Sequence, residues 1–197
     1  MKRIHNKDDI VQVGLDLVLS KGFSATGVET ILKQAKIPKG SFYNFFSSKE
    51  EFGLAIIDKF VEDRMEVLYP ILADDSLPPL ERVKKSFETI IAIFESNDCS
   101  KGCLLGNLGL EMSDHFENVR QRLEQSLQNW TKGLSELLLQ AQDAHTIPAE
   151  INVEMLAENL ISSFQGALLR SKVKKSAQPL KDFIHLYFNV FLSQREG

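Results

Sequence analysis

The sequence has little cysteine and no long apolar run, and each scarcity excludes a class of protein. Its two cysteines cannot form the framework of a disulfide-rich secreted domain. No stretch approaches the roughly 18 uninterrupted apolar residues that a membrane span needs, and the first residues lack the apolar core of a signal peptide. We therefore expect a cytoplasmic protein without a membrane partner.

Motifs for enzymatic chemistry are also missing. No phosphate-binding glycine loop, zinc-protease motif or hydrolase nucleophile motif occurs in the sequence. The histidines are scattered, and the C-x3-C spacing of the cysteines matches neither a thioredoxin-like centre nor, without a second pair, a zinc site. We expect no catalytic residue, no metal and no cofactor.

Positive charge is not in excess, because 23 basic side chains face 27 acidic ones and the net charge is −4. Taken over the whole chain, this balance argues against a nucleic-acid-binding protein. However, residues 1–49 carry eight basic and four acidic side chains (net +4), and the remainder carries 15 and 23 (net −8). Either surface charge simply fluctuates along the chain, or contact with a polyanion is confined to its first quarter.

Apolar residues recur at helical spacing along most of the chain, and the alternation typical of strands is absent. Prolines separate several of the helical segments, because they cannot continue a helix. The sequence therefore predicts an all-α protein of about nine helices. The predicted helices are 8–21, 28–35, 39–45, 49–72, 79–95, 104–113, 116–143, 150–173 and 179–194.

Local signals mark several helix ends. Gly22 follows the first helix as a terminating glycine. Thr26 with Glu29 matches the T-x-x-E capping box for the helix at 28–35, and Ser48 with Glu51 matches the same device for the helix at 49–72.

The helices at 28–35 and 39–45 are too short to bury their own apolar faces. The helix at 8–21 supplies the missing face, which completes a three-helix helix-turn-helix unit. We expect Phe42 and Phe46 in its core and the 39–45 helix as the recognition helix.

Two runs of this unit, KGFSATGV at 21–28 and IPKGSFYNFFSSKEEF at 37–52, resemble the DNA-binding domain of the TetR family. The resemblance implies a DNA-binding domain at 1–66, with the fourth helix as a link, and an effector-sensing and dimerisation domain at 67–197. It also implies a bacterial regulator, usually a repressor, that binds a double-stranded DNA operator and associates with the nucleoid when bound.

The resemblance assigns seven residues to DNA binding. They are Thr26, Lys39, Gly40, Ser41, Tyr43, Asn44 and Lys49. The ammonium groups of Lys39 and Lys49 would attract phosphates, and Tyr43 would hydrogen-bond a phosphate oxygen, as would Thr26. Asn44 suits an adenine edge, Ser41 can also reach a base, and Gly40 permits a close approach to the duplex.

A recognition helix of about two turns contacts few base pairs, so we expect a homodimer on a pseudo-palindromic operator. The helices at 150–173 and 179–194 are expected to form a four-helix interface, with Ser162, Ser163 and Gly166 allowing a close crossing. A role for the same helices in the core of a single chain stays open.

Cys103 directly follows Gly102 at a predicted helix start, where unbonded amides and Lys101 would favour the thiolate. The run GCLLGNL at 102–108, followed by Glu111, resembles the electrophile-responsive NemR-type branch of the TetR family, and Lys172 occupies a matching place. This resemblance implies that Cys103 senses electrophiles or oxidants, with Lys172 as a candidate amine coupled to it. An inert core role for Cys103 stays open, because cysteines are often small buried hydrophobes.

An apolar pocket for a small-molecule effector is a second possibility for the same domain. Its expected lining residues are Phe87, Phe94, Met112, Trp130, Met155 and Phe164. Two other functions are alternatives to regulation: a thiol-based helical enzyme, and a protein-binding helical module that would not need the block from Lys39 to Lys49.

Overall fold

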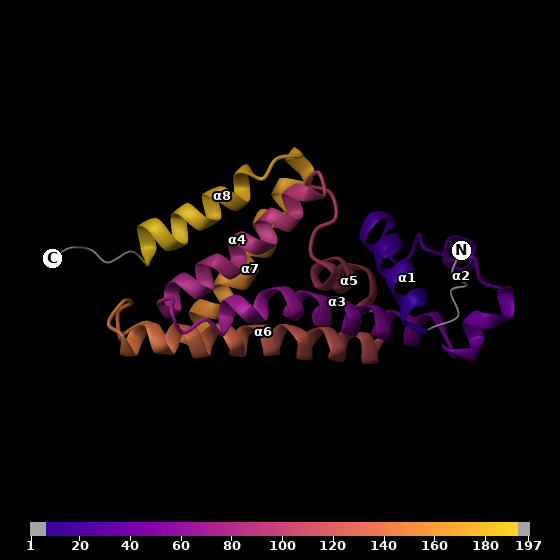
Figure 1. The fold of residues 1–197 in the computed structure, drawn as a ribbon, viewed down its shortest axis with the longest axis horizontal. Coiled ribbons are helices and arrows are strands. Elements are labelled where there is room, and N and C mark those ends of the chain that lie inside the picture. Colours follow the sequence, from indigo (N-terminus) through magenta and orange to yellow (C-terminus); the bar gives the residue numbers. More distant parts are fainter. Residues whose placement is uncertain (1–6, 193–197) are drawn as a thin grey trace. The chain divides into compact units, whose positions relative to one another are not determined.

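Helices make up all the regular structure in the part of the chain that the structure describes. It is a computed structural model that describes residues 7–192, without the side chains of Lys39 and Ser41. The elements (Figure 1) are α1 (Lys7–Lys21), α2 (Val28–Ala35), η1 (Lys39–Asn44), α3 (Lys49–Leu72), α4 (Pro79–Ser96), α5 (Leu104–Met112), α6 (Glu117–Asp143), α7 (Val153–Lys174), α8 (Gln178–Ile184) and η2 (His185–Phe191).

The predicted all-α fold is confirmed, with two differences in helix type. The element at Lys39–Asn44 is a 3-10 helix and not an α-helix. The last predicted helix begins at Gln178 as α8 and continues through His185–Phe191 as a π-helix, η2. Residues 193–194 of that prediction lie outside the described residues.

The two predicted capping boxes have different outcomes. At α3, the backbone N–H of Glu51 donates to the Ser48 hydroxyl at 3.0 Å, as predicted, while the Glu51 carboxylate accepts from Ser47. At α2 the predicted box is wrong, because Gly27 occupies the N-cap and no side chain caps this end. The Thr26 hydroxyl instead donates to the carbonyl of Gly22 at 2.7 Å.

Two compact units divide the chain. The first unit consists of Met1–Arg64 with Leu104–Ser126, and the second of Met65–Cys103 with Leu127–Gly197. The chain therefore passes from the second unit into the first between Cys103 and Leu104. The predicted functional division near residue 66 stays a prediction.

Aromatic rings form the centre of the first unit. Phe42, Phe46 and Phe52 are buried, with ring centroids 5.0–5.2 Å apart. α1 approaches this cluster closely at Gly14, where an added Cβ would lie 2.1 Å from Cζ of Phe52. The expected core positions of Phe42 and Phe46 are thus confirmed.

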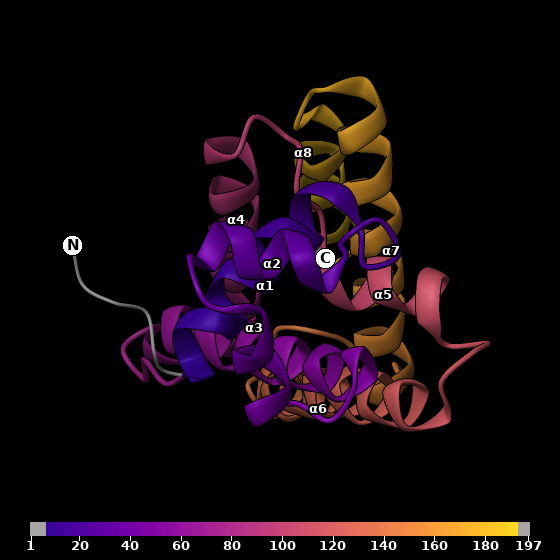
Figure 2. The same ribbon diagram turned by 90° about the vertical axis from the view of Figure 1, so that its right-hand side faces the viewer.

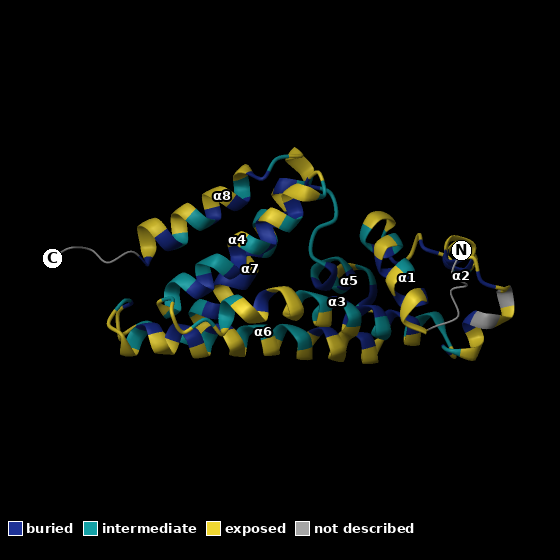
Figure 3. Cartoon of the chain, in the orientation of Figure 1, coloured by how far each residue is buried: buried dark blue, intermediate teal, exposed yellow. Residues whose placement is uncertain are grey.

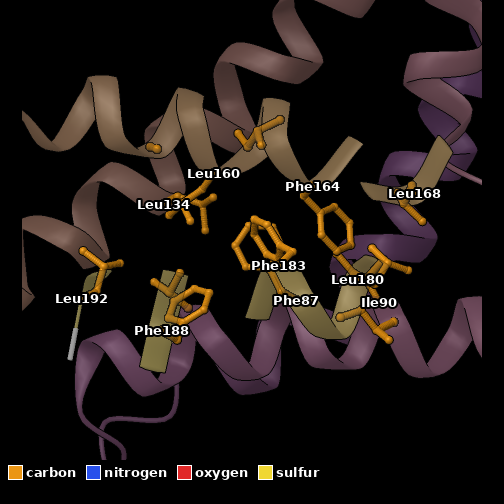
Figure 4. Packing of buried hydrophobic residues seen from close by; sticks show 14 of the residues in the cluster. Phe87, Ile90, Leu134, Leu160, Phe164, Leu168, Leu180, Phe183, Phe188 and Leu192 are labelled. Atoms are coloured by element: carbon orange, nitrogen blue, oxygen red, sulfur yellow. The ribbon is translucent and has the colours of Figure 1, made fainter. Parts of the chain in front are cut away.

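The second unit has a continuous apolar core supplied by α4, α6, α7, α8 and η2. The rings of Phe87, Phe164 and Phe183 lie at its centre with centroids 4.9–5.4 Å apart (Figure 4). α7 packs beside α8 (Figure 2), and buried and exposed residues alternate along both helices (Figure 3). Much of the apolar surface of the last two predicted helices therefore serves the core of a single chain.

Within residues 7–192, no helix combines the length and the apolar character that crossing a membrane would require.

Gly14→Ala should lower the free energy of unfolding by about 1–3 kcal/mol, because the new methyl group would overlap a fully buried ring. Gly133→Ala in α6 is the matched control, since no heavy atom lies within 4 Å of its added Cβ. The control should be neutral or stabilising by up to about 1 kcal/mol. Chemical denaturation of both variants tests this, and an unchanged or increased stability of Gly14→Ala would contradict the packing.

Candidate nucleic-acid interface

The element predicted to read DNA is held by one buried side chain. η1 follows Pro38, whose extended backbone sets its start, and Phe42 anchors it with no exposed surface. A 3-10 helix has three residues per turn, so Gly40 and Tyr43 share one of its ridges. Tyr43 is 62% exposed, with its ring edge-on to Phe42.

The exposed face of η1 contains the residues expected to reach DNA. Gly40, Tyr43 and Asn44 are all exposed, and no heavy atom lies within 4 Å of a Cβ added at Gly40. The side chains of Lys39 and Ser41, to which DNA contacts are also predicted, lie outside the described residues. The described part of η1 thus presents the hydroxyl of Tyr43 and the side-chain amide of Asn44 to solvent. At Gly40 the backbone itself is open to solvent.

Thr26 has a different environment from the one expected. Its side chain is fully buried, and its hydroxyl donates to the carbonyl oxygen of Gly22 within the turn between α1 and α2. A phosphate contact would require the hydroxyl to leave this bond. The structure gives Thr26 an internal contact, and its contact with DNA stays a prediction without support from this geometry.

Lys49 is also engaged inside the first unit. Its ammonium Nζ donates to the carbonyl of Phe23 at 2.8 Å and lies 4.4 Å from the centroid of the Phe23 ring. Partial burial lowers the pKa of Lys49, and the negative charge of Glu111 opposes that shift. An ammonium has three N–H donors, so Lys49 can hold the turn and still offer a donor to a phosphate.

Glu111 is a site residue that sequence reasoning did not single out for this role. Its carboxylate Oε2 accepts the backbone N–H of Ser24 at 2.9 Å, although 87 positions separate the two residues. The available signal was local: α5 has the sequence LLGNLGLEM, in which Glu111 is the only charged residue. Only folding shows which turn that carboxylate contacts.

The expected effector residues fall into two groups. Phe87, Trp130 and Phe164 contact one another in the second unit, with centroids 4.9–6.5 Å apart, and Phe94 belongs to the same apolar core. Met112 belongs to the first unit, at the end of α5. Met155, in the first turn of α7, is 61% exposed and does not line this core. The structure therefore gathers four of the six expected lining residues in one core.

The two cysteines lie in the segment between α4 and α5, and neither is in a disulfide. Cys103 is half-buried, packs against the core of the second unit and directly precedes α5. Cys99 is buried with a left-handed backbone, φ 51°. Lys172 is half-buried in the last turn of α7.

Lys181 is a further amine near the cysteine segment, and the sequence did not indicate it. Lys181 donates to Glu95 at 2.8 Å. This hydrogen bond and the Glu95 charge raise the pKa of Lys181, with a smaller contribution from the Cys99 thiol. Among residues 7–192, no group of three or more His, Cys, Asp or Glu side chains is placed to hold a metal ion.

Two known family descriptions match separate parts of this chain. Residues 10–56 match the family described as "Bacterial regulatory proteins, tetR family". Residues 79–187, more than half of the chain, match the family described as "Tetracyclin repressor-like, C-terminal domain". The chain belongs to the TetR family. It is therefore a DNA-binding transcriptional regulator and not an enzyme.

Individual relatives agree with this membership. The chain is 33% identical to the HTH-type transcriptional repressor DhaR of Mycobacterium sp. (strain GP1), over 100% of this chain and 98% of that protein. The crystal structure of the regulatory protein TetR from Rhodobacter sphaeroides superposes with a TM-score of 0.87 at 33% identity, covering 91% of this chain and 95% of that one. The crystal structure of reduced Escherichia coli NemR superposes with a TM-score of 0.80 at 26% identity, covering 93% of this chain and 96% of that one.

Lys49→Ala should weaken DNA binding across sequences and reduce the slope of log affinity against log salt by about one, because one phosphate contact is lost. Lys132→Ala, which removes an exposed lysine from α6, is the control and should leave the slope unchanged. Fluorescence anisotropy over a salt series measures both. An unchanged slope for Lys49→Ala would restrict this ammonium to its contacts with Phe23.

Proposed function

We propose that this TetR-family regulator is a repressor that binds a pseudo-palindromic operator as a homodimer. A small molecule or a reactive electrophile that acts on the second domain, residues 67–197, would release it from DNA. The proposal rests on the arrangement of η1. Its Phe42 is buried, and the neighbouring Tyr43 and Asn44 are exposed to solvent.

The size of η1 supports a dimer. Six residues can contact few base pairs, so one copy would bind weakly and with little specificity. Two copies related by a twofold axis would read two half-sites about one helical turn, roughly 34 Å, apart or somewhat more. Repression rests on the relatives, since DhaR and NemR are both named as repressors.

An exposed face of α7 supports the predicted dimer interface. Ser162, Gly166, Leu169 and Val173 are all exposed at helical spacing, and Leu169 and Val173 leave 59% and 75% of their surface uncovered. A Cβ added at Gly166 would meet nothing within 4 Å, so a second helix has room to approach. Ser163 faces inward instead, because its hydroxyl is hydrogen-bonded to the Tyr187 hydroxyl at 2.7 Å.

The η2 helix extends this apolar face. Leu186 and Val190 stand one turn apart and are each 43% exposed, and Phe191 is 61% exposed. Exposed apolar side chains on two neighbouring helices of one core are typical of a helix-pair dimer interface. The four-helix interface expected for the last two helices thus uses side chains that are distinct from the core residues.

Two effector mechanisms fit the second domain. In the first, the Cys103 sulfur adds to an electrophilic carbon of a quinone or an unsaturated aldehyde, and the thiol proton moves to the adduct. The half-buried Cys103 directly precedes α5, so an adduct there would displace the start of that helix. Lys172 would be the coupled amine, as the NemR-type resemblance implies.

In the second mechanism, a small apolar molecule binds among Phe87, Trp130 and Phe164, whose rings contact one another. Phe94 belongs to the same core, whereas Met112 lies in the other unit and is left out of this proposal. In both mechanisms, effector and DNA select different conformations of one dimer.

Selection of bound fragments from random and genomic DNA by the purified full chain tests the proposed function. The recovered sequences should share two inverted half-sites, and Tyr43→Ala should reduce recovery. The same selection with p-benzoquinone present should recover little operator. Recovery of a single unrepeated half-site would contradict the dimer, and recovery of no common sequence would contradict operator binding.

Cys103→Ser should keep operator affinity and lose most of the release caused by p-benzoquinone, because serine lacks the nucleophilic thiolate. Cys99→Ser is the matched control and should respond like the original chain, since Cys99 is buried. Anisotropy with labelled operator gives both values, and mass spectrometry locates the adduct. Full release of Cys103→Ser would eliminate the thiol mechanism and leave the apolar one.

A further inference from the structure

The turn that joins α1 to α2 is held by hydrogen bonds from three sides. Gly22 starts it in the left-handed region, with φ 87°. The Thr26 hydroxyl closes it onto the carbonyl of Gly22 at 2.7 Å, and the Thr26 N–H donates to Phe23 at 3.1 Å. Lys49 donates to the same Phe23 carbonyl at 2.8 Å.

The remaining contact comes from α5, a helix distant in the sequence. Oε2 of Glu111 accepts the N–H of Ser24 at 2.9 Å. A Cβ at Gly22 would lie 2.9 Å from Oε1 of the same carboxylate. Gly22 is therefore needed for its backbone conformation, and a side chain there would also displace the Glu111 carboxylate.

The next residue of α5, Met112, lies near the same part of α3 as Phe23 of the turn. A Cβ added at Gly53 of α3 would lie 3.1 Å from the Phe23 ring and 3.4 Å from Cε of Met112. The buried side chains of Phe23 and Met112 thus both lie against α3 at Gly53, where α3 has no side chain. Glu111 and Met112 together bring the end of α5 against the turn and against α3.

We propose that Glu111 is a positioning residue for DNA binding, which fixes the α1–α2 turn through the Ser24 N–H and so determines where α2 and η1 stand. α2 begins at Val28, four residues after Ser24, and packs against both α1 and η1. A shift of the turn is therefore passed directly to the reading element. The inference goes beyond the proposed effector mechanism and requires neither Cys103 nor an effector.

Charge alone predicts the opposite effect on DNA affinity. Glu111 is a negative charge close to Lys49, and its removal should strengthen attraction to phosphates if the carboxylate had no positioning role. A positioning role instead predicts weaker binding whenever the hydrogen bond is lost, whatever the charge. The direction of the change in DNA affinity therefore distinguishes a pure charge effect of Glu111 from a positioning role.

Two substitutions separate charge from hydrogen bonding. Glu111→Asp keeps the charge but shortens the side chain by one methylene, so that it no longer reaches Ser24. Glu111→Gln removes the charge but keeps a carbonyl oxygen that can accept the same N–H. Asp114→Asn, at an exposed position just beyond α5, is the control for charge removal alone.

Hydrogen–deuterium exchange of the full chain and DNA affinity are the two measurements. Glu111→Asp should exchange about fivefold faster in the peptide that covers residues 22–28 and bind operator about fivefold more weakly, which is the range for one net hydrogen bond. Glu111→Gln and Asp114→Asn should keep the original exchange and bind as tightly as the original chain or more tightly. Thermal unfolding checks that each variant is folded.

The inference is overturned if Glu111→Asp shows unchanged exchange or unchanged affinity, or if Glu111→Gln loses as much as Glu111→Asp. Should Glu111→Asp fail to fold, Glu111→Met replaces it, because methionine keeps the length of the side chain but has no carboxylate or amide oxygen to accept the Ser24 N–H. Glu111→Met should then exchange faster over residues 22–28 than Glu111→Gln, and equal exchange of the two variants would overturn the inference. Exchange needs no DNA, so failure of operator binding and failure of this inference are distinguishable.

Discussion

Burial of Phe42 is the constraint on which the proposed DNA-reading surface depends. A single 3-10 element of six residues has too few internal hydrogen bonds to persist alone. Phe42 ties it to Phe46 and Phe52, and Gly14 lets α1 approach these rings closely enough to cover them. Because Phe42 points inward, its neighbours Tyr43 and Asn44 are forced outward, where a duplex can reach them.

Polar side chains of the first unit divide into two groups with different tasks. Tyr43 and Asn44 are exposed on the reading element, whereas Thr26 and Lys49 are bonded to backbone carbonyls of the turn before α2. Glu111 joins the second group from α5. Residues that the sequence assigns to DNA contact therefore also hold the turn that precedes the proposed reading surface.

Most helices were predictable, because amphipathic periodicity and proline positions are local signals. The predicted cap at Thr26 was wrong because its hydroxyl finds a closer partner in Gly22 and Gly27 takes the N-cap. The 3-10 form of η1 was missed because periodicity over six residues cannot separate two helix types. The sequence also did not predict that Met112 belongs to the first unit, because this depends on how α5 packs.

The sequence by itself determined the helical class, the helix-turn-helix unit and the family, because these depend on residue patterns within a few turns of one another. It also located the basic first quarter of a chain with net charge −4. Only the tertiary structure decided which side chain each polar group meets. Ser24 and Glu111 lie 87 positions apart, and no local pattern encodes a hydrogen bond across that separation.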